Sequence, residues 1–307
     1  MGLTFLEARK SEVDPLRRAL INELSQGELL GIIPFENVEN GGVQYNQTAE
    51  LPSVAFRGVN EVLPSGYGVI NPQFEAWKMM GGDIDVDTSI INTQGEGEIA
   101  KQVTMGIQSM RMAFEDKFIN GDETLNPREF DGLKKRVPIG SSQAISAGGA
   151  LSLTKLDELI DACDAAGGQQ KVLVMNRTIA RLLNAASRDT TKSGFIVHDR
   201  DQFGRRVATY NDCLIVRTMV NGQNQEVQPF TESGSSTSVY CISFGDLLTT
   251  AIQGRVGQQF GPSIRPLGEV DDAPVNRTRL EWYAGLAIYH GRSVARLHGV
   301  TNAAVIA

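Results

Sequence analysis

GEIAKQVTMGIQSMRMAFEDKFIN, residues 97–120, is the stretch of sequence that decides the fold. Its apolar residues follow one another at steps of four, four, three, four and four. These steps place them on one stripe of an α-helix: Ile99, Val103, Ile107, Met110, Phe114 and Phe118. Gly121-Asp122 ends the helix. The sequence therefore predicts a rod about 35 Å long, at about 1.5 Å per residue, between an extended part before it and a compact part after it.

Length and composition favour one large domain or two ordinary ones, since the 307 residues are 41% hydrophobic and 21% charged. The formal net charge is −7, and no run of five like charges occurs. A groove that grips nucleic acid needs a basic patch, so this composition argues against one. It leaves open a protein that lies near nucleic acid without binding it specifically.

The cysteines and the N-terminus indicate where the chain is made. Cys163, Cys213 and Cys241 are far apart, in no C-x-x-C spacing and near apolar neighbours, which predicts buried free thiols and a reducing compartment. Residues 1–10 lack the basic and apolar regions of a secretory signal, and no apolar run reaches membrane-spanning length. We expect synthesis in the cytoplasm and no membrane partner.

Residues 1–33 predict two short amphipathic helices. Thr4 and Glu7 have the spacing of a capping box, and Asp14-Pro15 opens a second helix. Their apolar faces need a partner, which is either the rest of the chain or a neighbouring copy.

Residues 34–80 lack a helical stripe and predict an extended hairpin. Short β-like pieces at 42–47, 54–59 and 68–74 are separated by glycine and proline. The stretch has no obvious core of its own, so we expect it to lie on a neighbouring subunit that covers its apolar residues. The candidate contact residues are Tyr45, Phe56, Arg57, Tyr67 and Phe74.

The alternation Gly82-Asp83-Ile84-Asp85-Val86-Asp87 has two interpretations. The D-x-D-x-D spacing resembles a calcium loop, but its sixth position is Thr88 and its twelfth is Gln94, where such a loop has Gly and Glu. We therefore predict a strand with one solvated face that leads to the long helix.

The second half of the chain predicts a compact α/β unit followed by long strands. Residues 138–149 read as a Ser/Gly-rich connector, and helices begin at Thr154 and Asn176. We predict strands at 171–175, 195–198, 213–219 and 239–244, and long strands at 247–256, 260–267 and 277–289. The last residues, 299–307, are expected to tuck in or fray.

Enzyme signatures are absent from the sequence. It contains no G-x-S-x-G, Walker or G-x-G-x-x-G motif. Its three histidines, His198, His290 and His298, are too scattered for a zinc site by spacing, and Asp271-Asp272 favours a solvated loop. We assign no catalytic, cofactor-binding or metal-binding residue and expect no cofactor.

Three local motifs carry a resemblance. They are FINGD at 118–122 followed by FDGL at 130–133, VLVMN at 172–176, and RLEW at 279–282 leading to GLAI at 285–288. In this order they resemble the spine-helix exit, the axial-domain strand and helix, and the C-terminal strand of the major capsid proteins of tailed phages. The resemblance spans nearly the whole chain and implies the Hong Kong 97-type fold, of class α+β.

The resemblance implies a division of the chain. It comprises an N-terminal arm at 1–33, an extended loop at 34–80, a β-rich peripheral domain at 81–140 and 245–307 with the spine helix, and a compact α/β axial domain at 141–244. It also implies pentamers and hexamers that close into an icosahedral shell around double-stranded DNA, in the virion of a phage made in a bacterial cytoplasm. Further candidate inter-subunit contacts are Glu269, Asp271 and Asp272.

Two departures from the family pattern are informative. Some members cross-link the extended loop to a neighbour through a lysine, but residues 41–77 contain none and Lys78 is the first. We expect no such bond. Some members carry a domain-sized scaffolding segment before the arm, whereas this chain has only its two short helices there. We therefore expect a separate scaffolding protein or none. A portal and a decoration protein are further candidate partners. Two alternatives stay open, namely an encapsulin-type cage around a cargo enzyme and an α/β enzyme.

Overall fold

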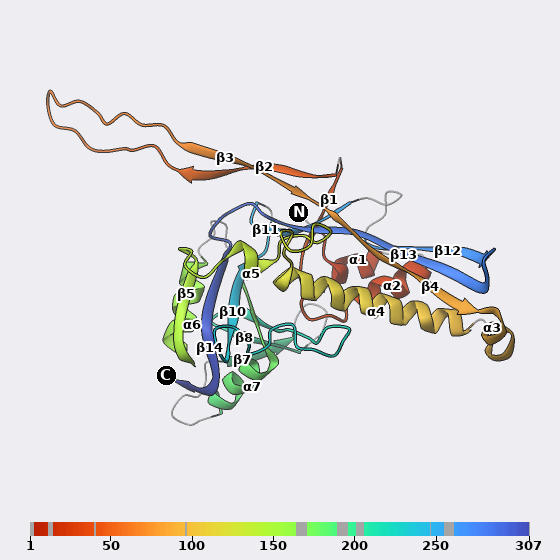
Figure 1. Ribbon diagram of the computed structural model, residues 1–307. Coiled ribbons are helices and arrows are strands. Elements are labelled where there is room, and N and C mark those ends of the chain that lie inside the picture. Colours follow the sequence, from red (N-terminus) through yellow and green to blue (C-terminus); the bar gives the residue numbers. More distant parts are fainter. Residues whose placement is uncertain are drawn as a thin grey trace.

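A computed structural model describes residues 3–11, 15–39, 41–95, 97–163, 171–188, 196–200, 206–245, 247–254 and 261–306. In this part of the chain, two mixed sheets meet near the C-terminal end of one long helix, and a two-stranded hairpin projects from their junction (Figure 1). The architecture is α+β, as predicted.

The spine helix α4 spans Gly97–Asn120, the range predicted from the sequence. The stripe is buried from Ile107 onward, whereas Ile99 and Val103 are half-buried. Phe114 is fully buried, with its ring centroid 4.8 Å from that of Trp282. The helix lies along one face of the first sheet (Figure 1), so its apolar stripe forms the centre of the larger core.

The first sheet has the strand order β1-β11-β13-β12, and β4 also pairs with β13. Its strands are β1 (Phe35–Val38), β4 (Lys78–Asp87), β11 (Thr249–Gly254), β12 (Ser263–Val270) and β13 (Ala273–Ile288). The short helix α3 (Thr88–Gln94) joins β4 to the spine. The long strands β12 and β13 predicted after residue 247 are confirmed, and together with β4 they form the slender end of the molecule (Figure 1).

The aspartates of β4 have protein partners. Asp83 accepts two hydrogen bonds from Arg279 at 2.7 and 2.8 Å, and Asp85 accepts two from Arg277 at 2.7 Å. Asp87 accepts from the Ser89 amide and caps α3. The strand interpretation is confirmed.

The N-terminal arm packs on its own chain. It contains α1 (Phe5–Ser11) and α2 (Pro15–Leu24). The predicted capping box is confirmed, since the Thr4 amide donates to the Glu7 carboxylate at 3.0 Å and the Glu7 amide donates to the Thr4 hydroxyl at 3.3 Å. Phe5 and Leu20 are buried in the core that contains Phe114. Asp14, the predicted cap of the second helix, lies outside the described residues.

The second sheet has seven strands in the order β5-β14-β10-β6-β9-β8-β7. They are β5 (Ala144–Ser152), β6 (Lys171–Met175), β7 (Ile196–Arg200), β8 (Arg206–Tyr210), β9 (Cys213–Arg217), β10 (Ser236–Ser243) and β14 (Val294–Ile306). Helices α6 (Leu153–Ala162) and α7 (Arg177–Ala186) pack on one face with a second core that holds the three cysteines, which are buried and free as predicted.

Three local predictions were wrong. The supposed connector 138–149 contains most of β5. Residues 299–307 were expected to tuck in or fray, and as far as Ile306 they tuck in as part of β14, which pairs with β10 and β5. This last strand therefore lies in the sheet of the predicted axial domain, although 245–307 was assigned to the peripheral domain. Residues 54–59 form no strand. The helix expected from Thr154 begins at Leu153, with Ser152 as its N-cap.

Candidate inter-subunit surface

The hairpin of β2 (Gly42–Glu50) and β3 (Val69–Ala76) projects away from both sheets (Figure 1). The two strands pair with each other from Gly42 opposite Ala76 to Glu50 opposite Val69. Residues 51–68 extend beyond this pairing and contain no helix or strand. The sequence predicted an extended hairpin from its turn residues and its lack of a core. The structure confirms that this segment is an extended hairpin.

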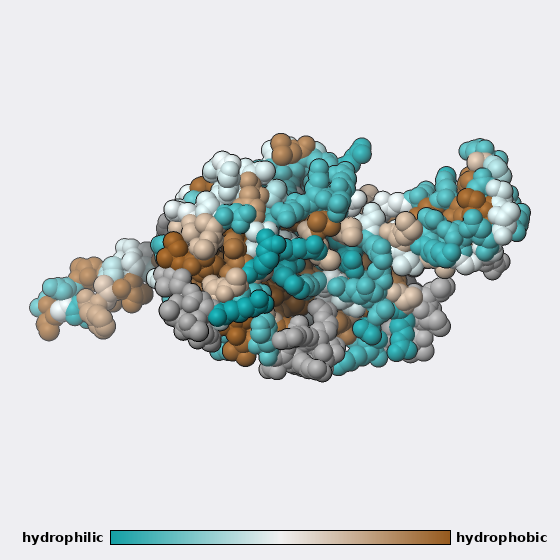
Figure 2. All heavy atoms as spheres, turned by 90° about the horizontal axis from the view of Figure 1, so that it is seen from below, coloured by the Kyte–Doolittle hydropathy of each residue, from teal (hydrophilic) through white to brown (hydrophobic). Residues whose placement is uncertain are grey.

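The hairpin carries a concentration of exposed apolar side chains. In the described residues, nine of the 19 large apolar side chains that are exposed lie between Leu51 and Phe74. We call these nine the hairpin patch: Leu51, Val54, Phe56, Val59, Val62, Leu63, Tyr67, Ile70 and Phe74. Figure 2 shows apolar residues on the projecting arm. Exposed apolar side chains gathered in one segment indicate a binding surface.

Three of the predicted contact residues belong to this patch, and a fourth organises its turn. Phe56 is fully exposed, Tyr67 is 86% exposed and Phe74 is 62% exposed. Arg57 donates from Nη1 to the Glu61 carbonyl at 3.1 Å, while the Glu61 carboxylate accepts from the Gly58 amide at 2.7 Å. Arg57 therefore stabilises the turn at the tip of the hairpin.

Tyr45 lies at the root of the hairpin and packs on its own chain. Its ring meets the Tyr289 ring edge-on, with centroids 4.8 Å apart. The Tyr289 hydroxyl in turn donates to Glu36 at 2.7 Å. Burial, with a contribution from the nearby Glu75 carboxylate, raises the pKa of Tyr45 above its ordinary value. The structure therefore places Tyr45 where the hairpin is fixed to the first sheet.

A mostly buried ion pair also fixes the root. Arg136, in the short helix α5 (Leu133–Arg136), donates to both carboxylate oxygens of Glu75, at 2.5 and 2.6 Å. The two side chains are 15% and 19% exposed. Hydrogen bonds and charge from Glu75 raise the pKa of Arg136, although burial opposes this. Since β3 and α5 are far apart in sequence, no local pattern could have revealed this pair.

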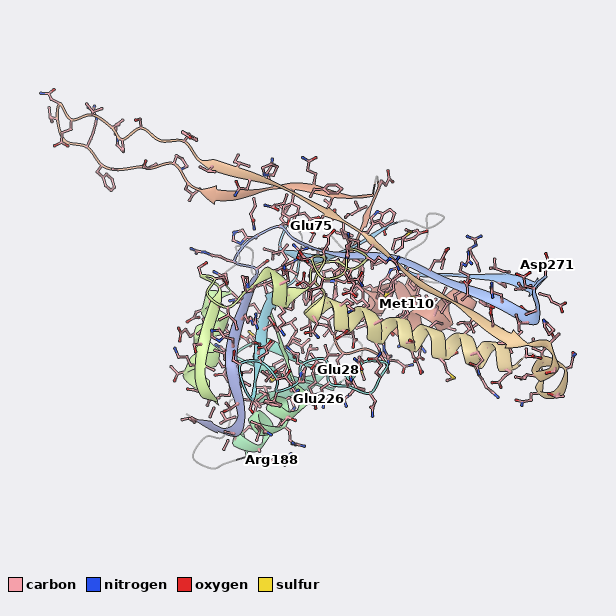
Figure 3. The ribbon with its side chains drawn as sticks, in the orientation of Figure 1. Glu28, Glu75, Met110, Arg188, Glu226 and Asp271 are labelled. Atoms are coloured by element: carbon pink, nitrogen blue, oxygen red, sulfur yellow. The ribbon has the colours of Figure 1, made fainter. Side chains whose placement is uncertain are left out.

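Glu269, Asp271 and Asp272 lie at the other end of the molecule. Glu269 lies in β12, where it pairs with Asn276, and Asp271 and Asp272 form the exposed turn between β12 and β13. Figure 3 shows Asp271 at this far end, away from Glu75 at the hairpin root. The structure therefore does not bring the acidic group and the hairpin patch together, and their roles as contacts stay predictions.

A buried arginine that sequence reasoning missed ties strands of the second sheet to α5. Arg296 of β14 is 2% exposed and donates to Glu232 and to the Ser238 hydroxyl, both at 3.0 Å. Burial would raise the pKa of Glu232, but the Ser238 hydrogen bond and the charge of Arg296 hold it below its ordinary value. A charged residue between apolar neighbours gives no sign of such partners, so only the structure could identify it.

The described residues show neither a metal-binding cluster nor a membrane-spanning helix. Within them, no group of three His, Cys, Asp or Glu residues is arranged to hold a metal ion. None of the helices in this part of the chain combines the length and apolar character needed to cross a membrane.

Comparisons with known proteins agree with this architecture. Residues 85–213 match the family model described as SU10 major capsid protein. No curated protein matches the sequence.

Solved structures are similar over nearly the whole chain. The SrpI encapsulin of Synechococcus elongatus is 17% identical with a TM-score of 0.67, and the match covers 100% of this chain and 99% of that one. A protein of Microbacterium phage Oxtober96 is 13% identical with a TM-score of 0.60, covering 90% of each chain. The capsid of the native GTA particle is 13% identical with a TM-score of 0.58, covering 94% and 93%.

The family model that matches describes a structural capsid protein, and the solved structures show that the fold is shared. The predicted resemblance is confirmed. The chain has the Hong Kong 97-type fold that phage capsid proteins and encapsulins share, and over residues 85–213 it is similar to the SU10 major capsid protein family.

Proposed function

We propose that this chain assembles as pentamers and hexamers into an icosahedral shell that encloses double-stranded phage DNA, with each hairpin patch lying on a neighbouring copy. The observation that carries the proposal is the projecting hairpin with its nine exposed apolar side chains. In this proposal residues 1–33 are the arm and 34–80 the extended loop. Residues 81–140 and most of 245–293 form the peripheral domain, and β14 joins the axial domain of 141–244.

Burial of the patch favours this contact. Fully burying one large apolar side chain contributes roughly 1.5–3 kcal/mol. Burial of several such side chains, including Phe56 and Tyr67, therefore offsets the cost of bringing two copies together. Because the hairpin lies on a different surface of the next copy, the contact repeats around a ring and is multiplied in a closed shell.

The charge of the chain fits an enclosure that does not grip its contents. The net charge of the chain is −7, so the chain as a whole has no electrostatic attraction to DNA. A separate scaffolding protein and a portal would then set the size of the shell and the entry of DNA.

Negative-stain microscopy after size-exclusion chromatography tests the assembly. The informative variant is Phe56→Ser with Tyr67→Ser, and the matched control is Leu125→Ser, which removes an apolar side chain 85% exposed outside the hairpin. We expect rings or shells for the wild type and the control, and folded, unassembled protein for the hairpin variant. A hairpin variant that assembles like the wild type would refute the role of the patch.

An encapsulin-type cage is the second candidate, favoured by the end-to-end likeness to the SrpI encapsulin. The contents of the shell separate the two functions. Particles from the native source, treated with nuclease, should show the absorbance ratio at 260 and 280 nm of enclosed DNA. A ratio typical of protein, with a second polypeptide on a gel, would favour the cage.

A further inference from the structure

The short helix α5 lies between the hairpin and the seven-stranded sheet. Its four residues follow the loop that leaves the spine helix, and β5 begins soon after it. Leu133 is fully buried in the larger core. Arg136 belongs to this helix and Arg296 donates hydrogen bonds to its backbone, and the two arginines connect it to different parts of the molecule.

On the hairpin side, Arg136 is the connecting residue. Besides its two bonds to Glu75, it donates from Nε to the Asp131 carbonyl at 2.9 Å and from Nη2 to the Leu286 carbonyl at 3.1 Å. These bonds fix the guanidinium at four points, on β3, β13 and the turn before α5. A displacement of Glu75 would therefore act on α5 directly.

On the side of the second sheet, Arg296 is the connecting residue. Its Nη1 donates to the carbonyls of Lys134 and Val137, at 3.3 and 3.0 Å. Its other nitrogens reach Ser238 and Glu232, so one fully buried guanidinium holds α5, β14 and the start of β10 together.

The backbone around α5 is packed too tightly for the helix to deform locally. The Gly132 amide donates to the Gly121 carbonyl at 2.9 Å, just beyond the spine helix. A Cβ atom at Gly132 would lie 2.6 Å from the Lys117 carbonyl oxygen, so the backbone here is packed without free space. The helix is therefore suited to shift as a unit rather than to absorb a displacement.

We propose that α5 couples the orientation of the hairpin to the packing of the seven-stranded sheet, through Glu75–Arg136 on one side and Arg296–Glu232 on the other. The coupling is a property of the single chain. If the proposed function holds, docking of the hairpin on a neighbouring copy would also change the packing of the axial domain. This consequence for assembly rests on the proposed function. Any such coupling must be reciprocal, so loosening either end should loosen the other.

Hydrogen exchange on the unassembled full-length chain tests the coupling. In Glu75→Gln we expect amide exchange to rise about tenfold at Val137, which donates to Leu133, and at the paired amides of Glu232 and Ser236. The matched control is Tyr289→Phe, which removes the bond to Glu36 at the hairpin root without touching Arg136. The control should change exchange only around β1 and the hairpin root.

The reciprocal variant is Glu232→Gln, which should raise exchange at the paired backbone of Gly42 and Ala76. A rise in Glu75→Gln that stays within β2 and β3 would overturn the proposal. If exchange rises equally in β12, which makes no bond to Arg136 or Arg296 among the described residues, the variant is globally destabilised. Arg136→Lys, which keeps the charge but loses the paired bonds, then decides by the same two readouts. Because no step needs assembly, this result is independent of whether shells form.

Discussion

Glu115 is a residue at which the structure predicts that stability depends on pH near neutrality. It lies on the spine helix facing the N-terminal arm and is only 3% exposed. Burial raises the pKa of its carboxyl to about 7, because the charged Arg111 and the Leu30 amide offset the lost hydration only in part, and Glu28 opposes them. The folded chain therefore holds a proton more tightly than the unfolded chain, whose value is 4.5.

The sign and size of the effect follow from this difference. Stability from the protonated carboxyl is fully present below about pH 4.5 and is lost as the pH rises through about 7. Between pH 5 and pH 8.5 the loss is about 2–3 kcal/mol, at about 1.4 kcal/mol per pH unit. Glu115→Gln removes the titration, so its stability relative to the wild type should rise by this amount over the same interval.

Urea unfolding of the unassembled chain at pH 5 and 8.5, followed by the fluorescence of the fully buried Trp282, measures the difference. Glu98→Gln is the matched control on the same helix. Its carboxylate accepts from Lys101 at 3.0 Å and from Gln102 at 3.1 Å, and these bonds lower its pKa. This control should gain nothing at high pH. A Glu115→Gln difference that stays constant with pH would refute the reasoning.

Three further predictions concern the arm, the second sheet and the hairpin. Gly27→Ala should lower the free energy of unfolding by about 1–3 kcal/mol, because the new Cβ would lie 2.4 Å from a Glu115 carboxylate oxygen; an unchanged urea midpoint would contradict this. Asn176→Ala should cost about 2–3 kcal/mol in thermal unfolding, since the side chain caps α7 and donates to the Gln228 carbonyl at 2.5 Å; a loss below about 0.5 kcal/mol would rule out this role. Denaturing gels of mature particles should show monomer only, since residues 41–77 contain no lysine and Lys78 is held by Glu123 at 2.6 Å, and a ladder would disprove it.

The spine helix and the two long strands after it could be predicted because their signals are local. The 3.6-residue period of 97–120 identifies a helix without reference to anything else in the chain. The capping box at Thr4 and the cap at Asn176 are similarly contained within a few residues, and both are confirmed.

Strands β5 and β14 could not be predicted because their signals are not local. AISAGGALS at 144–152 has the composition of a linker, and it becomes a strand by pairing in parallel with β14, about 150 residues later. The buried partners of Arg296 and Arg136 were missed for the same reason. The sequence predicted the hairpin patch as one continuous segment. The hairpin root could not be predicted, because it depends on contacts between residues that are far apart in the sequence.

The difference between the hairpin patch and the hairpin root carries the argument for assembly. A folded chain normally scatters its exposed apolar side chains singly, whereas here nine lie within one projecting arm. The base of the same arm is fixed by the Glu75–Arg136 pair and by Tyr45 on Tyr289. An arm with a fixed base and no internal partner for its apolar side chains is suited to bind a surface outside its own chain. Both proposed functions, a phage capsid and an encapsulin-type cage, use this contact between copies, so the hairpin variant tests assembly and only the contents of the shell distinguish the two.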